Sequence, residues 1–108
     1  MDIVGWRKQI DEIDRKLVEL ISERAHAAHE IGKLKKTASM PIYEPDREHA
    51  VFENVKNVNR GPLSQRDMLR VFERIIDIMR QIQREEIAPE PDLANQAHDT
   101  EIESDVND

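Results

Sequence analysis

The sequence predicts an all-α protein of three helices with a very long first helix, and three observations lead to this fold class. Apolar residues recur at alternating spacings of three and four over residues 3–38, and again after residue 64. The 108 residues include only 3 Gly and 5 Pro, too few turn signals for an all-β sandwich or barrel. No stretch approaches the roughly 20 consecutive apolar residues of a membrane-spanning helix.

The first helix is predicted over residues 3–38. Its stripe consists of apolar residues that share one helical face: Ile3, Trp6, Ile10, Ile13, Leu17, Leu20, Ala27, Ile31 and Leu34. Asp2 is placed to act as the N-cap, and Lys35 and Lys36 suit the negative end of the helix dipole. Pro41 ends the helix because proline cannot continue the hydrogen-bond ladder.

A second helix is predicted from about Asp46 to Val58. Pro45 fits the first helical position, where its missing N–H would have had no partner within the helix. Asp46 and Glu48 suit the positive end of the dipole, which supports a helix start at this point.

Gly61-Pro62 interrupts helical structure, and the third helix that follows is predicted to reach about Glu86. The run from Ser64 to Asp67 resembles a capping box, with Asp in place of the usual Glu or Gln. Its stripe consists of Met68, Phe72, Ile75, Met79 and Ile82, widened by Leu69, Val71, Ile76 and Ile78.

Residues 88–108 differ in composition from the rest of the chain. They are rich in Pro, Asn, Asp and Glu and contain few large apolar residues, which is typical of a disordered tail. Their seven acidic residues, without any Lys or Arg, account for the formal net charge of −7, so residues 1–87 are formally neutral. We therefore expect one helical domain at 1–87 and an acidic, disordered tail at 88–108.

Composition and motifs exclude several classes of function. Without cysteine there is no disulfide framework and no thiolate zinc site. The sequence has no P-loop, no dinucleotide-binding glycine pattern and no nucleophile elbow. Its basic residues form no aromatic-interleaved patch for nucleic acid. The N-terminus lacks the apolar core of a signal peptide, so we expect a cytoplasmic protein with no nucleic-acid or membrane partner.

The length of the first helix predicts a partner chain. A helix over residues 3–38 is about 54 Å long, whereas a compact domain of this size has a radius of gyration of about 12 Å. Two short helices cannot cover so long a stripe. The helix must bend, break, or bury its ends against another chain, and a homodimer is the simplest of these solutions.

Arg24 interrupts the apolar stripe. Positions 3, 10, 17, 24 and 31 are seven residues apart, and all are Ile or Leu except this one. A buried guanidinium without a partner is very costly. Arg24 therefore either pairs with an acid of a neighbouring helix and fixes the register, or forms an anion site inside a helical bundle.

Lys35 and Arg7 lie on the same side of the helix as Arg24. Lys35 is about 16 Å from Arg24 along the helix, but about 42 Å from Arg7. One chain's Arg7 and Lys35 cannot hold the same small molecule, so a shared site would need Arg7 from an antiparallel partner. For either residue alone, a solvated helix face is the simpler interpretation.

Several other polar residues admit two interpretations. Arg47 and Glu48 stand at the start of the second helix, where N–H groups and cations can bind anions, or where ordinary first-turn charges can lie. Gln83 borders the apolar face of the third helix, either at the surface or as a donor into the bundle. His26 and His29 lack a matching carboxylate motif, so surface histidines are favoured over a metal site.

The chain resembles the all-helical class of chorismate mutases. The matching strings, in order, are Trp6-Arg7-Lys8-Gln9-Ile10-Asp11-Glu12-Ile13-Asp14, Leu20-Ile21-Ser22-Glu23-Arg24, Ile31-Gly32-Lys33-Leu34-Lys35, Pro41-Ile42-Tyr43-Glu44-Pro45-Asp46-Arg47-Glu48, and Phe72-Glu73-Arg74-Ile75-Ile76 leading to Gln83. They cover residues 3 to about 86. The resemblance implies an intertwined helical homodimer with two active sites shared between chains, converting chorismate to prephenate in phenylalanine and tyrosine biosynthesis.

The resemblance also implies roles for individual residues. Arg24 and the partner subunit's Arg7 would grip the two substrate carboxylates. Lys35 would contact a carboxylate and the ether oxygen of the breaking bond, and Gln83 would donate to that same oxygen. These groups hold a flexible dianion in its reactive shape and stabilise charge on the ether oxygen, so the resemblance implies no cofactor, metal or nucleophile.

Three further positions belong to the implied substrate site. Glu48 would accept from the ring hydroxyl, with Arg47 shaping the site beside it. Glu44 stands where aspartate is common in the family. Met79 stands where a serine can contact a carboxylate, and it is not counted among the site residues. Two rival functions stay open: an isochorismate pyruvate-lyase of the same fold, and a non-catalytic helical dimer acting as an adaptor or regulatory domain.

Overall fold

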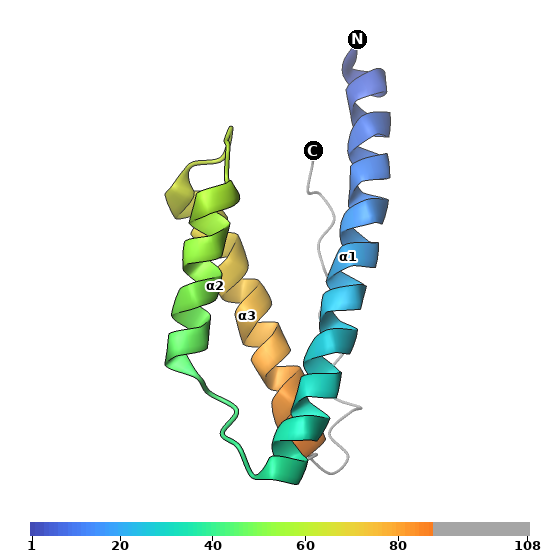
Figure 1. Cartoon of the computed structure of the whole chain (residues 1–108). Helices are drawn as coiled ribbons and strands as arrows, with labels where there is room; N and C mark the ends of the chain where they lie inside the picture. The colour runs from blue at the N-terminus through green and yellow to red at the C-terminus, as the bar shows by residue number, and fades with distance from the viewer. Residues whose placement is uncertain (88–108) are drawn as a thin grey trace. The chain divides into compact units, whose positions relative to one another are not determined.

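The structure is a computed structural model that describes residues 1–87 and contains three helices (Figure 1). They are α1 (Ile3–Ala38), α2 (Pro45–Val58) and α3 (Gln65–Ile87). These described residues contain no β-strand, which confirms the all-α prediction, and α1 is one helix of 36 residues, as predicted. None of the three helices is apolar enough over sufficient length to cross a membrane. The predicted tail at 88–108 lies outside the described residues.

The described chain falls into two compact units, residues 1–26 and residues 27–87. The first unit is the N-terminal part of α1. Asp2 caps it as predicted, because its Oδ1 accepts a hydrogen bond from the Gly5 N–H at 2.9 Å. The large apolar residues of the predicted stripe stay exposed in the single chain: Ile3, Trp6, Ile13, Leu17 and Leu20. This face is thus available for burial against another apolar surface.

The second unit contains the C-terminal part of α1, together with α2 and α3, which pack against each other (Figure 1). Its buried apolar side chains are Ala28, Val55, Ile76 and Met79. The start of α3 is capped by Ser64, whose Oγ accepts a hydrogen bond from the Asp67 N–H at 3.0 Å. The predicted cap at Ser64 is therefore confirmed.

The end of α1 is a Schellman turn. Ser39 takes a left-handed conformation with φ of 57°, and its N–H donates to the Lys36 carbonyl oxygen at 3.4 Å. The Met40 N–H donates to the Lys35 carbonyl oxygen at 2.9 Å. Helix α1 therefore stops before Pro41, as predicted, and the chain turns back towards the last turns of α1.

Gly32 is a point of close approach between α1 and α3. It is buried, and a Cβ added to it would lie 3.2 Å from the Cα of Gln83 and 3.3 Å from the Cβ of Glu86. Since backbone atoms cannot move away as a flexible side chain can, any side chain at this position would push α3 outward. The absence of a side chain at residue 32 sets the position of Gln83 relative to α1.

Replacing Gly32 with alanine tests this close approach. We expect Gly32→Ala to lower the free energy of unfolding by about 1 kcal/mol, because overpacking outweighs the gain in helix propensity. Urea unfolding followed by circular dichroism measures this change. Gly5→Ala is the matched control, since its new Cβ would meet only the flexible Met1 and Asp2 side chains. A Gly32→Ala protein as stable as the parent would contradict the predicted crowding.

Candidate active site

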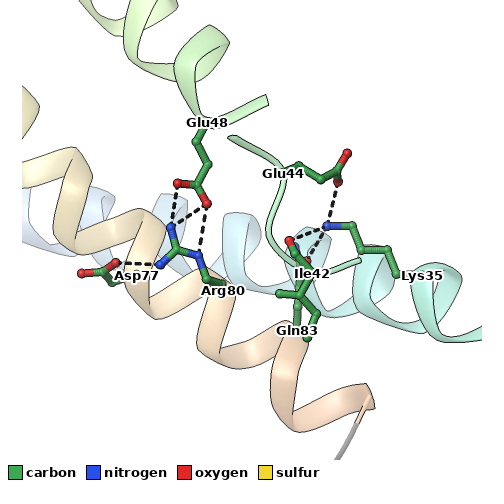
Figure 2. Close-up of polar contacts among 7 residues, drawn as sticks. All are labelled: Lys35, Ile42, Glu44, Glu48, Asp77, Arg80 and Gln83. Carbon is green, nitrogen blue, oxygen red and sulfur yellow. Dashed lines mark hydrogen bonds and ion pairs between the residues drawn. The ribbon is translucent and has the colours of Figure 1, made fainter. Parts of the chain in front are cut away.

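Lys35 is the only charged side chain buried in the described part of the chain, with 6% of its surface exposed. Its Nζ donates to Gln83 Oε1 at 2.9 Å and to the Ile42 carbonyl oxygen at 3.0 Å, and lies 2.8 Å from Glu44 Oε1 (Figure 2). An ammonium group has three N–H donors, and three oxygens surround this one. Lys35 thus belongs to the core of the second unit rather than to a solvated helix face.

Two segments bring these three oxygens to Lys35, the stretch between α1 and α2 and the helix α3. The Schellman turn after α1 returns the chain so that Ile42 and Glu44 reach back to the helix they have just left. Gln83 comes from α3 through the close approach at Gly32. Glu44 is in the N-cap position of α2 but makes no side-chain capping bond there, and its carboxylate lies against Lys35 instead.

The Gln83 amide has a defined orientation. Lysine offers only donors, so the atom that faces Lys35 must be the amide oxygen, as the 2.9 Å contact to Oε1 shows. The NH₂ group of Gln83 is then the part of the amide that can donate to a bound molecule. This arrangement fits the second of the two interpretations of Gln83, a donor directed into the helical bundle.

Glu48 and Arg80 form an ion pair beside the polar group around Lys35 (Figure 2). Arg80 Nη2 donates to both carboxylate oxygens of Glu48 at 2.6 Å, and Nε donates to Oε2 at 3.1 Å. These hydrogen bonds raise the pKa of the Arg80 guanidinium above its ordinary value. Arg80 also donates to Asp77 at 3.2 Å and lies 5.3 Å from the ring centroid of Tyr43.

The polar group around Lys35 and the pair of Glu48 with Arg80 adjoin each other both at the start of α2 and on α3. Glu44 and Glu48 are joined by a backbone hydrogen bond of 3.0 Å at the start of α2. Arg80 and Gln83 are three residues apart on α3 and so share a face of that helix. Together with Asp77 they place two cations, three carboxylates and one amide in the second unit, so these groups carry one net negative charge.

This arrangement can bind and polarise anionic oxygen atoms. Lys35 is almost fully shielded from solvent, and a buried cation interacts strongly with any anion that reaches it. Among its partners, Glu44 has a side chain that is 40% exposed, against 7% for Lys35 itself. Glu44 is therefore the partner that an incoming anion can replace with the least disturbance of the core.

The structure brings together some of the predicted site residues and leaves others as predictions. Lys35, Glu44 and Gln83 are in contact, and Glu48 lies in the adjacent pair. Arg47 is exposed. Arg7 and Arg24 lie in the other unit, so their roles stay predictions.

The two histidines of α1 do not form a metal site in the described residues, where no group of three His, Asp or Glu could hold an ion. His29 Nδ1 instead lies 3.3 Å from Glu86 Oε2, which links α1 to α3 next to Gly32. Sequence reasoning missed Arg80. The available signal was a cation four residues after Ile76 and three before Gln83, at the edge of the α3 stripe.

Comparison with known proteins decides the family. A model of the chorismate mutase type II family matches residues 6–84, which is most of the chain. The chain belongs to the chorismate mutase type II family. The match includes every residue that contributes to the two polar groups around Lys35 and Arg80.

Individual members of the family differ in length. The chain is similar to a chorismate mutase of Methanocaldococcus jannaschii, 28% identical over 80 residues, which covers 73% of this chain and 81% of that protein. It is 38% identical over 74 residues to a bifunctional chorismate mutase/prephenate dehydratase of Neisseria gonorrhoeae, covering 68% of this chain and 20% of that protein. A T-protein of Enterobacter agglomerans is 26% identical over 91 residues, covering 84% of this chain and 23% of that protein. The chain thus spans about a fifth of the length of the bifunctional relatives.

Proposed function

We propose that this protein is a chorismate mutase, an isomerase that converts chorismate to prephenate. The observation that carries the proposal is the buried Lys35 ammonium beside the oriented Gln83 amide, in a chain of the chorismate mutase type II family. The proposal is tested by incubating the protein with chorismate and following the loss of its ultraviolet absorbance. Prephenate as the product supports it, and release of pyruvate from isochorismate would favour the lyase instead.

The proposed reaction suits a site without a nucleophile. The ether C–O bond breaks while a C–C bond forms within the same molecule, so no atom leaves and no proton must be transferred. Catalysis then depends on holding the reactive shape and on donors aimed at the ether oxygen, where negative charge develops. In our proposal Lys35 and the NH₂ group of Gln83 are these donors, and the Glu48 carboxylate accepts a hydrogen bond from the ring hydroxyl.

We further propose that the working form is a homodimer. The exposed apolar face of residues 1–26 supports this, because burying it against a second copy would remove a large apolar area from water. Arg7 of the partner subunit and Arg24 would then bind the two carboxylates of the substrate, with Arg47 beside Glu48.

Lys35→Ala is expected to reduce kcat by about 100-fold or more, since losing one such donor typically costs about 3–4 kcal/mol in the barrier. Steady-state kinetics with chorismate measures the effect. Lys36→Ala, an exposed neighbour, is the matched control and should keep normal turnover. Circular dichroism verifies folding, and Lys35→Gln, which retains an N–H donor, serves if the alanine variant unfolds. Normal turnover in a folded Lys35 variant would remove this residue from the site.

Gln83→Glu is expected to give an enzyme whose activity increases as the pH falls. A carboxyl group can donate to the ether oxygen only when it is protonated, and the protonated fraction grows towards acidic pH. The pH profile of kcat/KM shows the change against the parent. Gln81→Glu adds the same group to an exposed position of α3 and should leave the profile unchanged. A pH-independent Gln83→Glu enzyme would contradict the assignment.

The shared site is tested by mixing inactive variants. If Arg7 serves the partner's site, a mixture of Arg7→Ala and Lys35→Ala subunits forms hybrid dimers with one complete site, which restores about a quarter of the parental activity. The control is a mixture of Lys35→Ala and Gln83→Ala. Both residues belong to the same unit of one chain, so no hybrid has a complete site. Equal activity in the two mixtures would exclude a site shared in this way.

A further inference from the structure

The pair between Arg80 and Glu48 differs from an ordinary surface ion pair. It joins α2 to α3 through two residues 32 positions apart in sequence, and one guanidinium donates to both oxygens of one carboxylate. The side chains of Arg80 and Glu48 are only 21% and 22% exposed. Forked pairs with restricted access to water fix geometry as well as charge, which exposed pairs rarely do.

Arg80 is itself held from other directions. Asp77, one turn earlier on α3, accepts from Nη1 at 3.2 Å (Figure 2). The ring of Tyr43 lies 5.3 Å from the guanidinium carbon. A planar group bound by two carboxylates and an aromatic ring has little freedom to rotate. The position of the Glu48 carboxylate is therefore determined by a side chain that is itself fixed.

The pair leaves Glu48 able to accept one more hydrogen bond. A carboxylate has about four lone-pair positions, and the contacts with Arg80 occupy three of them at most. Arg80 also balances the charge of Glu48. Without it, Lys35 alone would face Glu44, Glu48 and Asp77, and the negative charge that the described site presents to an anionic molecule would increase by one.

We propose that Arg80 is a positioning residue. It orients the Glu48 carboxylate and balances its charge, so that this carboxylate can accept a hydrogen bond from the ring hydroxyl of a dianionic substrate. This rests on the proposed chorismate mutase function and adds a residue that acts through Glu48 without touching the substrate. The hydroxyl contact is made in the ground state and in the transition state alike. Loss of Arg80 therefore acts mainly on KM.

The test is a double-mutant cycle on steady-state kinetics with chorismate, using the full chain. We expect Arg80→Met to lower kcat/KM roughly 10-fold to 100-fold, mostly through a higher KM, as for the loss of a hydrogen bond to a charged group. In the Glu48→Gln background, where there is no carboxylate to orient, the same substitution should change kcat/KM by less than about 3-fold. Arg80→Lys should restore part of the loss because it returns the charge without the fork.

Arg70→Met is the matched control, the same substitution on the same helix at a side chain that is 69% exposed, and it should retain parental kinetics. Parental kcat/KM in Arg80→Met, or an equal loss in both backgrounds, would overturn the proposal while leaving the proposed function intact. A parent protein without turnover would instead overturn the proposed function, and the role of Arg80 with it. If Arg80→Met fails to fold, the cycle is completed with Arg80→Lys, which must then show its loss only when Glu48 is present.

Discussion

The burial of the Lys35 ammonium is the constraint on which the rest of the described site depends. Taking a lysine charge out of water is tolerated only when oxygen atoms replace the lost hydration. Those atoms come from two places: the stretch between α1 and α2, and α3. Satisfying one cation therefore requires that the last turns of α1, the loop and α3 meet at one point, and this meeting creates the site.

The helices could be predicted from sequence because their signals are local. The stripes predicted three helices, and these helices, the Asp2 and Ser64 caps and the stop before Pro41 were confirmed; each depends on residues a few positions apart. The partners of Lys35 could not be derived in this way. Periodicity left it on a solvated face as the simpler interpretation, and only the resemblance joined it to Gln83, 48 residues away.

Arg80 shows a different limit of sequence reasoning. It is one of several arginines on α3, and its spacing from Ile76 and Gln83 places it at the edge of the stripe without showing that it meets Glu48. The distinction arises only once α2 lies on α3 and Tyr43 and Asp77 close around the guanidinium. Similarly, the special position of Gly32 is invisible until α3 approaches α1.

The Schellman turn at Ser39 also determines which changes of chain length the protein can accept. Between this turn and the start of α2 at Pro45, Ile42 and Glu44 must each reach the same ammonium group. One inserted residue there would move at least one oxygen away and leave a buried positive charge short of a partner. The exposed turn between α2 and α3 supplies none of the oxygen atoms that contact Lys35. Insertions and deletions among homologues should therefore accumulate after Val58 and avoid the six residues that follow Ala38.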